Sequence, residues 1–291
     1  MDADAGLLIN AVISGLLIGG FYAAVSIGVA ISFGMLDIVN IAHPAFILLG
    51  SYAAFIGNTV FGIDPILATV ITLPAFYVLG MLAYQVYYVA FERRDDQSLR
   101  GLSFFFGILF IAEVGLILAF GVDYRSVQAW YTTGNLNLGI TELPWRLLVP
   151  FLLGLAMVVG LQLFLSRTFI GRAIQAVAQD QQALRLMAAN PAKIKRIAFG
   201  LSFATAALGG AALIIIQPVE PSIGREYIGR IFAICVLGGL GSFPGMVIAA
   251  MTLGVVENIT ATFFGPSWAP AVSFGVLLIT LAVRPSGILG R

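Results

Sequence analysis

The chain has 291 residues, of which 60% are hydrophobic and only 10% are charged, and its formal net charge is +1. This apolar fraction is far above that of soluble globular domains and predicts an all-α polytopic membrane protein. A net charge near zero gives no reason to expect nucleic acid as a partner, and the single cysteine, Cys235, excludes an intrachain disulfide and a cysteine-based metal cluster.

Apolar stretches long enough to cross a lipid bilayer follow one another along the chain, beginning with residues 7–33, which contain no charge. No lysine or arginine precedes Arg93, so we expect no cleavable signal peptide and a first span that is retained. Further spans are predicted at residues 38–57, 66–91, 101–121, 147–165, 197–216, 228–243, 245–264 and 270–283.

A glycine-rich turn interrupts the apolar sequence between the two spans predicted at 228–243 and 245–264. It either separates two spans or forms the tip of a re-entrant loop, so that eight or nine crossings are predicted. No flexible linker or low-complexity tract divides the chain, and residues 1–291 are therefore predicted to form a single transmembrane domain. The residues assigned to the tight or re-entrant turn are Gly241, Ser242, Pro244 and Gly245.

Residues 167–196 form a polar segment between two of these spans, with six basic residues and a single acid, Asp180. Burying six such charges at the centre of a bilayer would cost on the order of 15 to 20 kcal/mol, so the segment lies outside the membrane. Its basic excess places it in the cytoplasm, which puts the N-terminus outside and the C-terminus inside. In the nine-span arrangement Arg93, Arg94, Arg100, Arg284 and Arg291 share its side, against Arg125, Arg146, Arg225 and Arg230 on the other.

Within the polar segment, alanine, leucine and glutamine are frequent from Arg172 to Ala189, which predicts one helix of about 27 Å that the Asn190-Pro191 pair ends. Its apolar face is too weak to enter lipid and too apolar for a solvated tether. The pattern indicates either a docking helix for another protein or an amphipathic helix that lies on its own bundle. The residues of this face are Ile174, Val177, Leu184 and Ala188.

Small residues recur at helical spacing in two of the predicted spans, at Gly15 and Gly19 and again at Ala250, Gly254 and Ala261. Such stripes allow helix backbones to approach closely and predict a tightly packed bundle.

Several polar residues fall within or near membrane depth. Ionisable groups there are costly, and they mark either functional sites or structural pairs. Glu257 shares its helix face with the small-residue stripe, which is compatible with a structural contact or with a path, whereas bulky neighbours favour a packing or partner-facing role for Glu113. The candidates for a translocation path or for intramembrane polar contacts are Asn40, His43, Glu113, Glu257 and Asn258.

The sequence motifs of common enzymes are missing. The chain contains no G-x-x-x-x-G-K-[ST] loop for phosphate, no H-E-x-x-H zinc motif and no G-x-S-x-G nucleophile elbow. It is therefore predicted not to be an enzyme and to bind no cofactor, ATP included, by itself.

Four groups of residues, in order along nearly the whole chain, resemble a known family. They are the F-G-x-x-x-x-x-N-x-A-H pattern of residues 33–43, the polar segment from Gly171 to Asn190, the V-L-G-G-L-G-S-F-P-G run of residues 236–245 with the helix that follows it, and the R-P-S-G-I-L-G ending at 284–290. The chain is similar to the LivH type of permease subunit in ABC importers of branched-chain amino acids. It departs from that pattern at Ala188, where glycine is common, and at Pro44 and Ala45.

The resemblance implies half of a translocation path in a bacterial inner membrane, completed by a second related permease. It also implies two cytoplasmic ATPase subunits, which bind ATP and Mg²⁺, and a periplasmic protein that delivers leucine, isoleucine, valine or a related amino acid. The residues that would form the ATPase-coupling helix are Gly171, Arg172, Ala173, Ala176, Val177, Asp180, Leu186, Met187 and Asn190.

Two other classes of protein share the same composition. A stand-alone secondary transporter or channel would use Glu113 or Glu257 as its coupling carboxylate. Such a transporter would not need a helix shaped for ATPases, and a structural membrane subunit, the other alternative, would not need polar groups at membrane depth.

Overall fold

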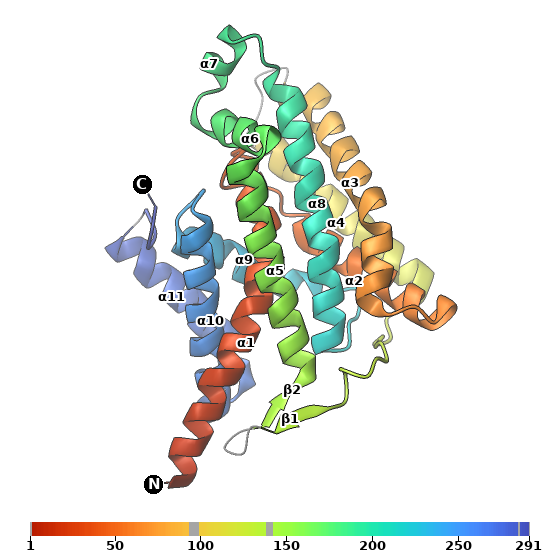
Figure 1. Cartoon of the computed structure of the whole chain (residues 1–291), viewed down its shortest axis with the longest axis vertical. Helices are drawn as coiled ribbons and strands as arrows, with labels where there is room; N and C mark the ends of the chain where they lie inside the picture. Colours follow the sequence, from red (N-terminus) through yellow and green to blue (C-terminus); the bar gives the residue numbers. More distant parts are fainter. Residues whose placement is uncertain (1, 93–98, 138–141, 285, 291) are drawn as a thin grey trace.

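The computed structural model of the protein describes residues 2–92, 99–137, 142–284 and 286–290. Arg93, Arg94 and Arg291, three of the basic residues used to predict the orientation, lie outside the described residues. The described part of the chain is a bundle of α-helices with one small β-hairpin (Figure 1). This confirms the predicted all-α polytopic membrane fold.

Eight helices of the described residues are long and apolar enough to cross a membrane, α11 being counted with the short turn η2 before it. Three shorter helices and two antiparallel strands complete the structure. The long helices are α1 (Asp2–Ser32), α2 (His43–Phe61), α3 (Pro65–Ala90), α4 (Leu99–Phe120), α5 (Trp145–Arg167), α8 (Pro191–Ile216), α10 (Phe243–Phe264) and α11 (Ala269–Val283) with η2 (Pro266–Trp268). The other elements are α6 (Phe169–Gln179), α7 (Gln181–Leu186), α9 (Gly224–Gly238), β1 (Asn135–Asn137) and β2 (Glu142–Pro144).

The bundle has two distinct ends. One, the hairpin end, carries β1, β2 and the N-terminus, and the other, the α6–α7 end, carries the two short helices of the polar segment (Figure 1). α1 and α8 form the centre of the bundle, with 72% of each apolar span buried, whereas α11 lies at the periphery with 11% buried.

The two predicted small-residue stripes pack against each other, because α1 and α10 lie side by side. A β-carbon on Gly254 would lie 2.4 Å from the carbonyl oxygen of Gly15, and one on Gly19 would lie 2.7 Å from the Cα of Met251. No side chain fits between the two backbones at these points, so the close approach that the stripes predicted is confirmed.

α2 and α9 both begin inside the bundle instead of at its ends. α2 starts at His43, whose Nε2 lies 3.2 Å from the carbonyl oxygen of Val25 in the middle of α1. α9 starts at Gly224, where a β-carbon would lie 2.8 Å from the Leu48 side chain of α2. The predicted spans 38–57 and 228–243 are therefore displaced, and irregular backbone precedes each helix, residues 33–42 before α2 and residues 217–223 before α9.

We expect Gly254→Ala to destabilise the protein, because even one methyl group must push α1 and α10 apart at a cost of about 1–3 kcal/mol. Thermal unfolding of the purified protein in detergent measures the effect. Gly275→Ala in α11 is the matched control, since a β-carbon there has nothing within 4 Å. Equal melting temperatures for the two variants would contradict the close packing of α1 on α10.

Candidate functional site

The polar segment forms two short helices, α6 and α7, instead of the single helix predicted over residues 172–189. Between them the backbone of Asp180 is extended, with φ −155° and ψ 106°. Its carboxylate accepts hydrogen bonds from the N–H groups of Gln182 (2.8 Å) and Ala183 (3.0 Å). The prediction of one helix is wrong because a side chain that caps a new helix competes with the continuation of the old one.

The apolar face predicted for this segment lies on the protein's own bundle. Ile174 and Val177 of α6 and Leu184 of α7 are buried, and Ile174 has no exposed surface. Gly171 lets α6 lie directly on the end of α5, since a β-carbon there would be 2.3 Å from the Phe164 carbonyl oxygen. Gly171 and Val177 therefore pack the segment against the bundle and are not exposed to a partner. Ala188, the fourth residue of the predicted face, is exposed, so the face packs on the bundle in part, and docking of a partner by the rest of the segment stays a prediction.

A different set of apolar side chains faces outward. Leu186 and Met187, at the end of α7, are 89% and 72% exposed, and Phe169 at the start of α6 is exposed as well. Sequence reasoning missed Phe169, although its position five residues before the buried Ile174 was a signal that it lies off the inner face. Among the other predicted coupling residues, Arg172, Asp180 and Asn190 are exposed, while Ala173 and Ala176 are half-buried.

The exit from α7 has the geometry that glycine usually provides. Ala188 has φ +59°, a left-handed conformation that L residues seldom adopt and glycine adopts freely. Two residues later the Asn190 side chain accepts a hydrogen bond from the N–H of Lys193 (3.3 Å) and caps α8. Asn190 is therefore exposed and also caps the start of α8.

The predicted turn lies at the α6–α7 end and separates α9 from α10, so it is not a re-entrant tip. Gly241 has φ +80°, and the hydroxyl of Ser242 accepts a hydrogen bond from the N–H of Gly245 (3.2 Å) at the start of α10. With Pro244, the turn lines a cavity of about 440 Å³ that Gln175 of α6 also lines. The structure therefore brings the turn and the polar segment together.

Glu257 lies at the centre of a buried polar cluster that joins four helices. Its carboxylate accepts hydrogen bonds from the hydroxyls of Tyr22 in α1 and Ser273 in α11, and from Nε of Arg230 in α9 (3.3 Å). The side chains of Glu257 and Arg230 are 5% and 15% exposed. We name these four residues the Glu257 cluster. Arg230, which the sequence analysis counted with the basic residues of the outer side, lies within α9 and pairs with this carboxylate.

Glu113 of α4 forms a second ion pair with α9. It accepts hydrogen bonds from Nε (2.8 Å) and Nη2 (2.5 Å) of Arg225, whose guanidinium also lies over the Phe110 ring at 5.3 Å. Two arginines near the start of α9 are therefore paired with carboxylates from α4 and α10 on either side of it. Glu113 therefore holds α4 and α9 together, which is a packing role.

The remaining polar candidates do not join these pairs. Asn40 and His43 are fully buried where α2 begins, and the amide group of Asn40 and Nδ1 of His43 have no hydrogen-bond partner among the described residues. Asn258 donates to the Gly254 carbonyl oxygen within α10 (3.2 Å). The five candidates therefore lie at three separate places and do not form one polar site.

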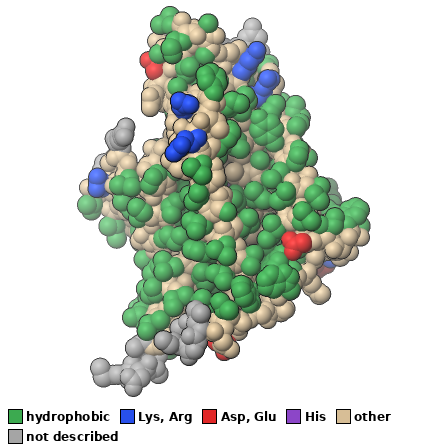
Figure 2. Space-filling model, in the orientation of Figure 1, with side chains coloured by type: hydrophobic (Ala, Val, Ile, Leu, Met, Phe, Trp, Pro, Cys, Tyr) green, Lys and Arg blue, Asp and Glu red, His purple; other side chains and the backbone are tan. Residues whose placement is uncertain are grey.

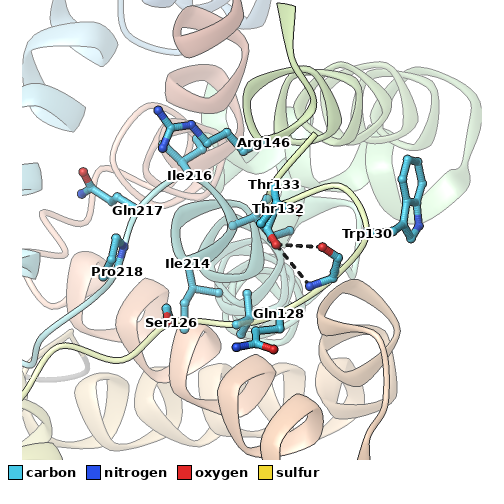
Figure 3. A pocket seen from close by; sticks show the side chains of 13 residues that line it. Ser126, Gln128, Trp130, Thr132, Thr133, Arg146, Ile214, Ile216, Gln217 and Pro218 are labelled. Atoms are coloured by element: carbon cyan, nitrogen blue, oxygen red, sulfur yellow. Dashed lines mark hydrogen bonds between the residues drawn. The ribbon is translucent and has the colours of Figure 1, made fainter. Parts of the chain in front are cut away.

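A pocket of about 710 Å³ opens at the hairpin end, between the loop after α4, the start of α5 and the end of α8 (Figure 3). Arg146 and Gln217 line it together with Thr132 and Thr133, and Arg146 makes no ion pair with any described residue. Sequence reasoning missed this pocket because no spacing pattern links residues 126–133 with residues 214–218.

Loss of the Glu257 carboxylate should destabilise the bundle, since Glu257→Ala leaves Arg230 buried without its partner at a cost of about 3–5 kcal/mol. Glu226→Ala is the matched control, because Glu226 lies 4.0 Å from the same arginine but is exposed, and its loss should cost under about 1 kcal/mol. Thermal unfolding in detergent checks both variants. If Glu257→Ala melts at the temperature of the control, the cluster does not hold the helices together.

Several curated proteins resemble the chain over most of its length. The high-affinity branched-chain amino acid transport system permease protein BraD of Pseudomonas aeruginosa is 28% identical, covering 96% of this chain and 94% of its own length. The permease protein LivM of the same kind of system in Salmonella typhimurium is 27% identical, over 92% of this chain and 67% of its own length.

Among solved structures, PsaBC from Streptococcus pneumoniae in complex with Fab has a similar fold, with a TM-score of 0.51 at 13% identity, covering 96% of this chain and 92% of that one. The family model described as branched-chain amino acid transport system / permease component matches residues 11–281. This match confirms the family that the sequence motifs indicated. The chain belongs to the family of permease components of branched-chain amino acid transport systems.

Proposed function

We propose that the protein is the permease subunit of an ATP-driven importer for branched-chain or related amino acids, and that it forms half of the translocation path. Membership of the permease family is the observation that carries the proposal. The protein itself performs no chemistry. ATP and Mg²⁺ bind to two partner ATPase subunits in the cytoplasm, and a periplasmic binding protein delivers the amino acid.

The ATPases contact the outer surface of the α6–α7 end. Leu186 and Met187 project from α7 beside the exposed Arg185, and large apolar side chains this exposed outside a membrane are typical of protein interfaces. α6 is suited to transmit force because Gly171, Ile174 and Val177 seat it on the bundle. Gln175 of α6 and the turn at Gly241 line one cavity, so α6 faces the connection between α9 and α10 across it.

The α6–α7 end faces the cytoplasm in this proposal, which leaves the N-terminus outside a bacterial inner membrane and the C-terminus inside. The described basic residues support it: Arg167, Arg172, Arg185, Lys193 and Arg196 all lie at this end, and on the visible face Lys and Arg side chains gather toward it (Figure 2). An excess of basic residues marks cytoplasmic connections. The pocket with Arg146 then opens outside, on the side where a periplasmic binding protein docks.

A second related permease completes the path. The similarity to LivM, a permease with a different name in the same kind of system, supports a pair of related subunits. The peripheral helices α3, α4 and α11 expose most of their apolar surface, which is available to a partner or to lipid.

A secondary transporter that uses an intramembrane carboxylate fits the structure less well. Both candidate carboxylates are held by arginines of α9, and Glu257 accepts two further hydrogen bonds. A coupling carboxylate must bind and release a proton or an ion during each cycle. Separating these carboxylates from their arginine partners for that step would be costly.

Replacing Leu186 and Met187 with aspartate should remove the ATPases from the complex while the second permease stays bound, because a charged pair cannot enter an apolar contact. Affinity purification of the tagged protein from detergent-solubilised native membranes measures this, and we expect at least a tenfold loss of ATPase, about 1.4 kcal/mol or more.

The control for this experiment is Val122→Asp, which places a charge on an equally exposed apolar residue at the hairpin end. Val177 is unsuitable as a test position because it is buried in the bundle. Undiminished recovery of ATPases with the Leu186 and Met187 variant would show that they bind elsewhere. A wild-type protein that purifies alone and moves amino acids without ATP would overturn the importer proposal.

A further inference from the structure

α9 is too short to cross the membrane by itself. Its 15 residues span about 22 Å at 1.5 Å per residue, against a hydrocarbon thickness of about 30 Å. The segment before it, residues 217–223, enters from the hairpin end, where Val219 and Arg125 exchange backbone hydrogen bonds of 2.8 and 2.9 Å. Irregular backbone at membrane depth is tolerated only where protein buries it or where it lines a water-filled cavity.

The exposed side chains at the start of α9 are charged. The side chain of Arg225 is 54% exposed although it pairs with Glu113, and that of the adjacent Glu226 is 67% exposed. Glu113 lies seven residues before the hairpin end of α4, at Phe120, which places the pair about 10 Å inside that end. Lipid cannot cover such charges at low cost, so this surface faces water or a partner.

The surface has a chemical character that suits a zwitterion. Guanidinium has five N–H donors, of which Glu113 occupies two, so Arg225 retains free donors for a carboxylate. Glu226 follows it on the helix, and its one ion pair with a described residue is the 4.0 Å contact to Arg230. Ser222, two residues before α9, is exposed on the same stretch of chain, and its hydroxyl donates a hydrogen bond to Oε1 of Glu220 (2.7 Å).

Resting on the importer function above, we propose that Ser222, Arg225 and Glu226 line the aqueous path on the outer side, and that Arg225 and Glu226 contact the carboxylate and the ammonium group of the amino acid in transit. The opposite wall of the path is the second permease. The Glu113 carboxylate acts as a positioning group that holds the guanidinium in place from α4.

Labelling of introduced cysteines tests this directly. Cys235 is buried, so the unmodified protein serves as the blank. Ser222→Cys is the test variant, Thr133→Cys in the hairpin-end loop is the water-exposed reference, and Ile111→Cys is the control on the apolar outer face of α4. The probe is a charged, membrane-impermeant methanethiosulfonate added outside proteoliposomes that hold the full complex, with mass spectrometry as the readout.

We expect Ser222→Cys to react within about tenfold of the Thr133→Cys rate and Ile111→Cys to react at least about tenfold more slowly, because only a hydrated thiol ionises and reacts. Adding leucine to a complex that already holds the binding protein should slow the reaction at Ser222→Cys relative to the same complex without leucine.

Labelling of Ser222→Cys no faster than that of Ile111→Cys, in a complex that still takes up amino acid with ATP, would overturn the path assignment while leaving the importer function intact. Labelling that no amino acid slows would overturn the contact with cargo. Failure of the proposed function itself would show differently, as a wild-type complex without ATP-dependent uptake.

Discussion

Charge that lies at membrane depth must be paired, and the structure of this permease depends on how α9 meets that requirement. Arg225 and Arg230 leave the same short helix toward carboxylates on two different helices, Glu113 of α4 and Glu257 of α10. An unpaired arginine there would cost several kcal/mol, so each pair fixes α9 against a neighbour. The hydroxyls of Tyr22 and Ser273 extend the second pair to α1 and α11.

These contacts make a broken crossing possible. α9 starts inside the bundle beside the equally displaced start of α2, and the two helices run from there toward opposite ends. Discontinuous helices with irregular backbone between them are a common way to build a transport path, because the backbone polar groups they release can face water or cargo. α1 and α10 contact each other closely through Gly15, Gly19 and Gly254, and α9 packs against both helices.

Long apolar sequences, charge-free except for Glu113 in α4, were enough to predict α1, α3, α4, α5 and α8, because in lipid an apolar run of that length has no alternative to a helix. The starts of α2 and α9 differ from the prediction by several residues, because contacts distant in sequence, His43 with Val25 and Val219 with Arg125, hold the backbone there in an irregular conformation. The short helices failed for a local reason: Asp180 caps α7 and breaks the predicted helix.

The candidate site was predicted in part. Sequence reasoning selected Glu113 and Glu257 as candidates but could not name Arg225 and Arg230 as their partners, because each pairing joins residues from different helices. It left open whether the apolar stripe of the polar segment docks a partner or lies on the bundle, and in the structure Ile174 and Val177 face inward while Leu186 and Met187 face outward. Periodicity shows that a helix has two faces, but tertiary packing decides which of them is covered.

In the proposed complex, the start of α9 faces an aqueous path between two permeases. A cryo-electron-microscopy map of the complete complex in a lipid nanodisc tests it most directly. We expect Arg225 and Glu226 to border a water-accessible cavity bounded by the second permease, with Glu113 still paired to Arg225. Acyl chains packed on Arg225 and Glu226, or a path lined by other helices with α9 remote from it, would contradict the claim.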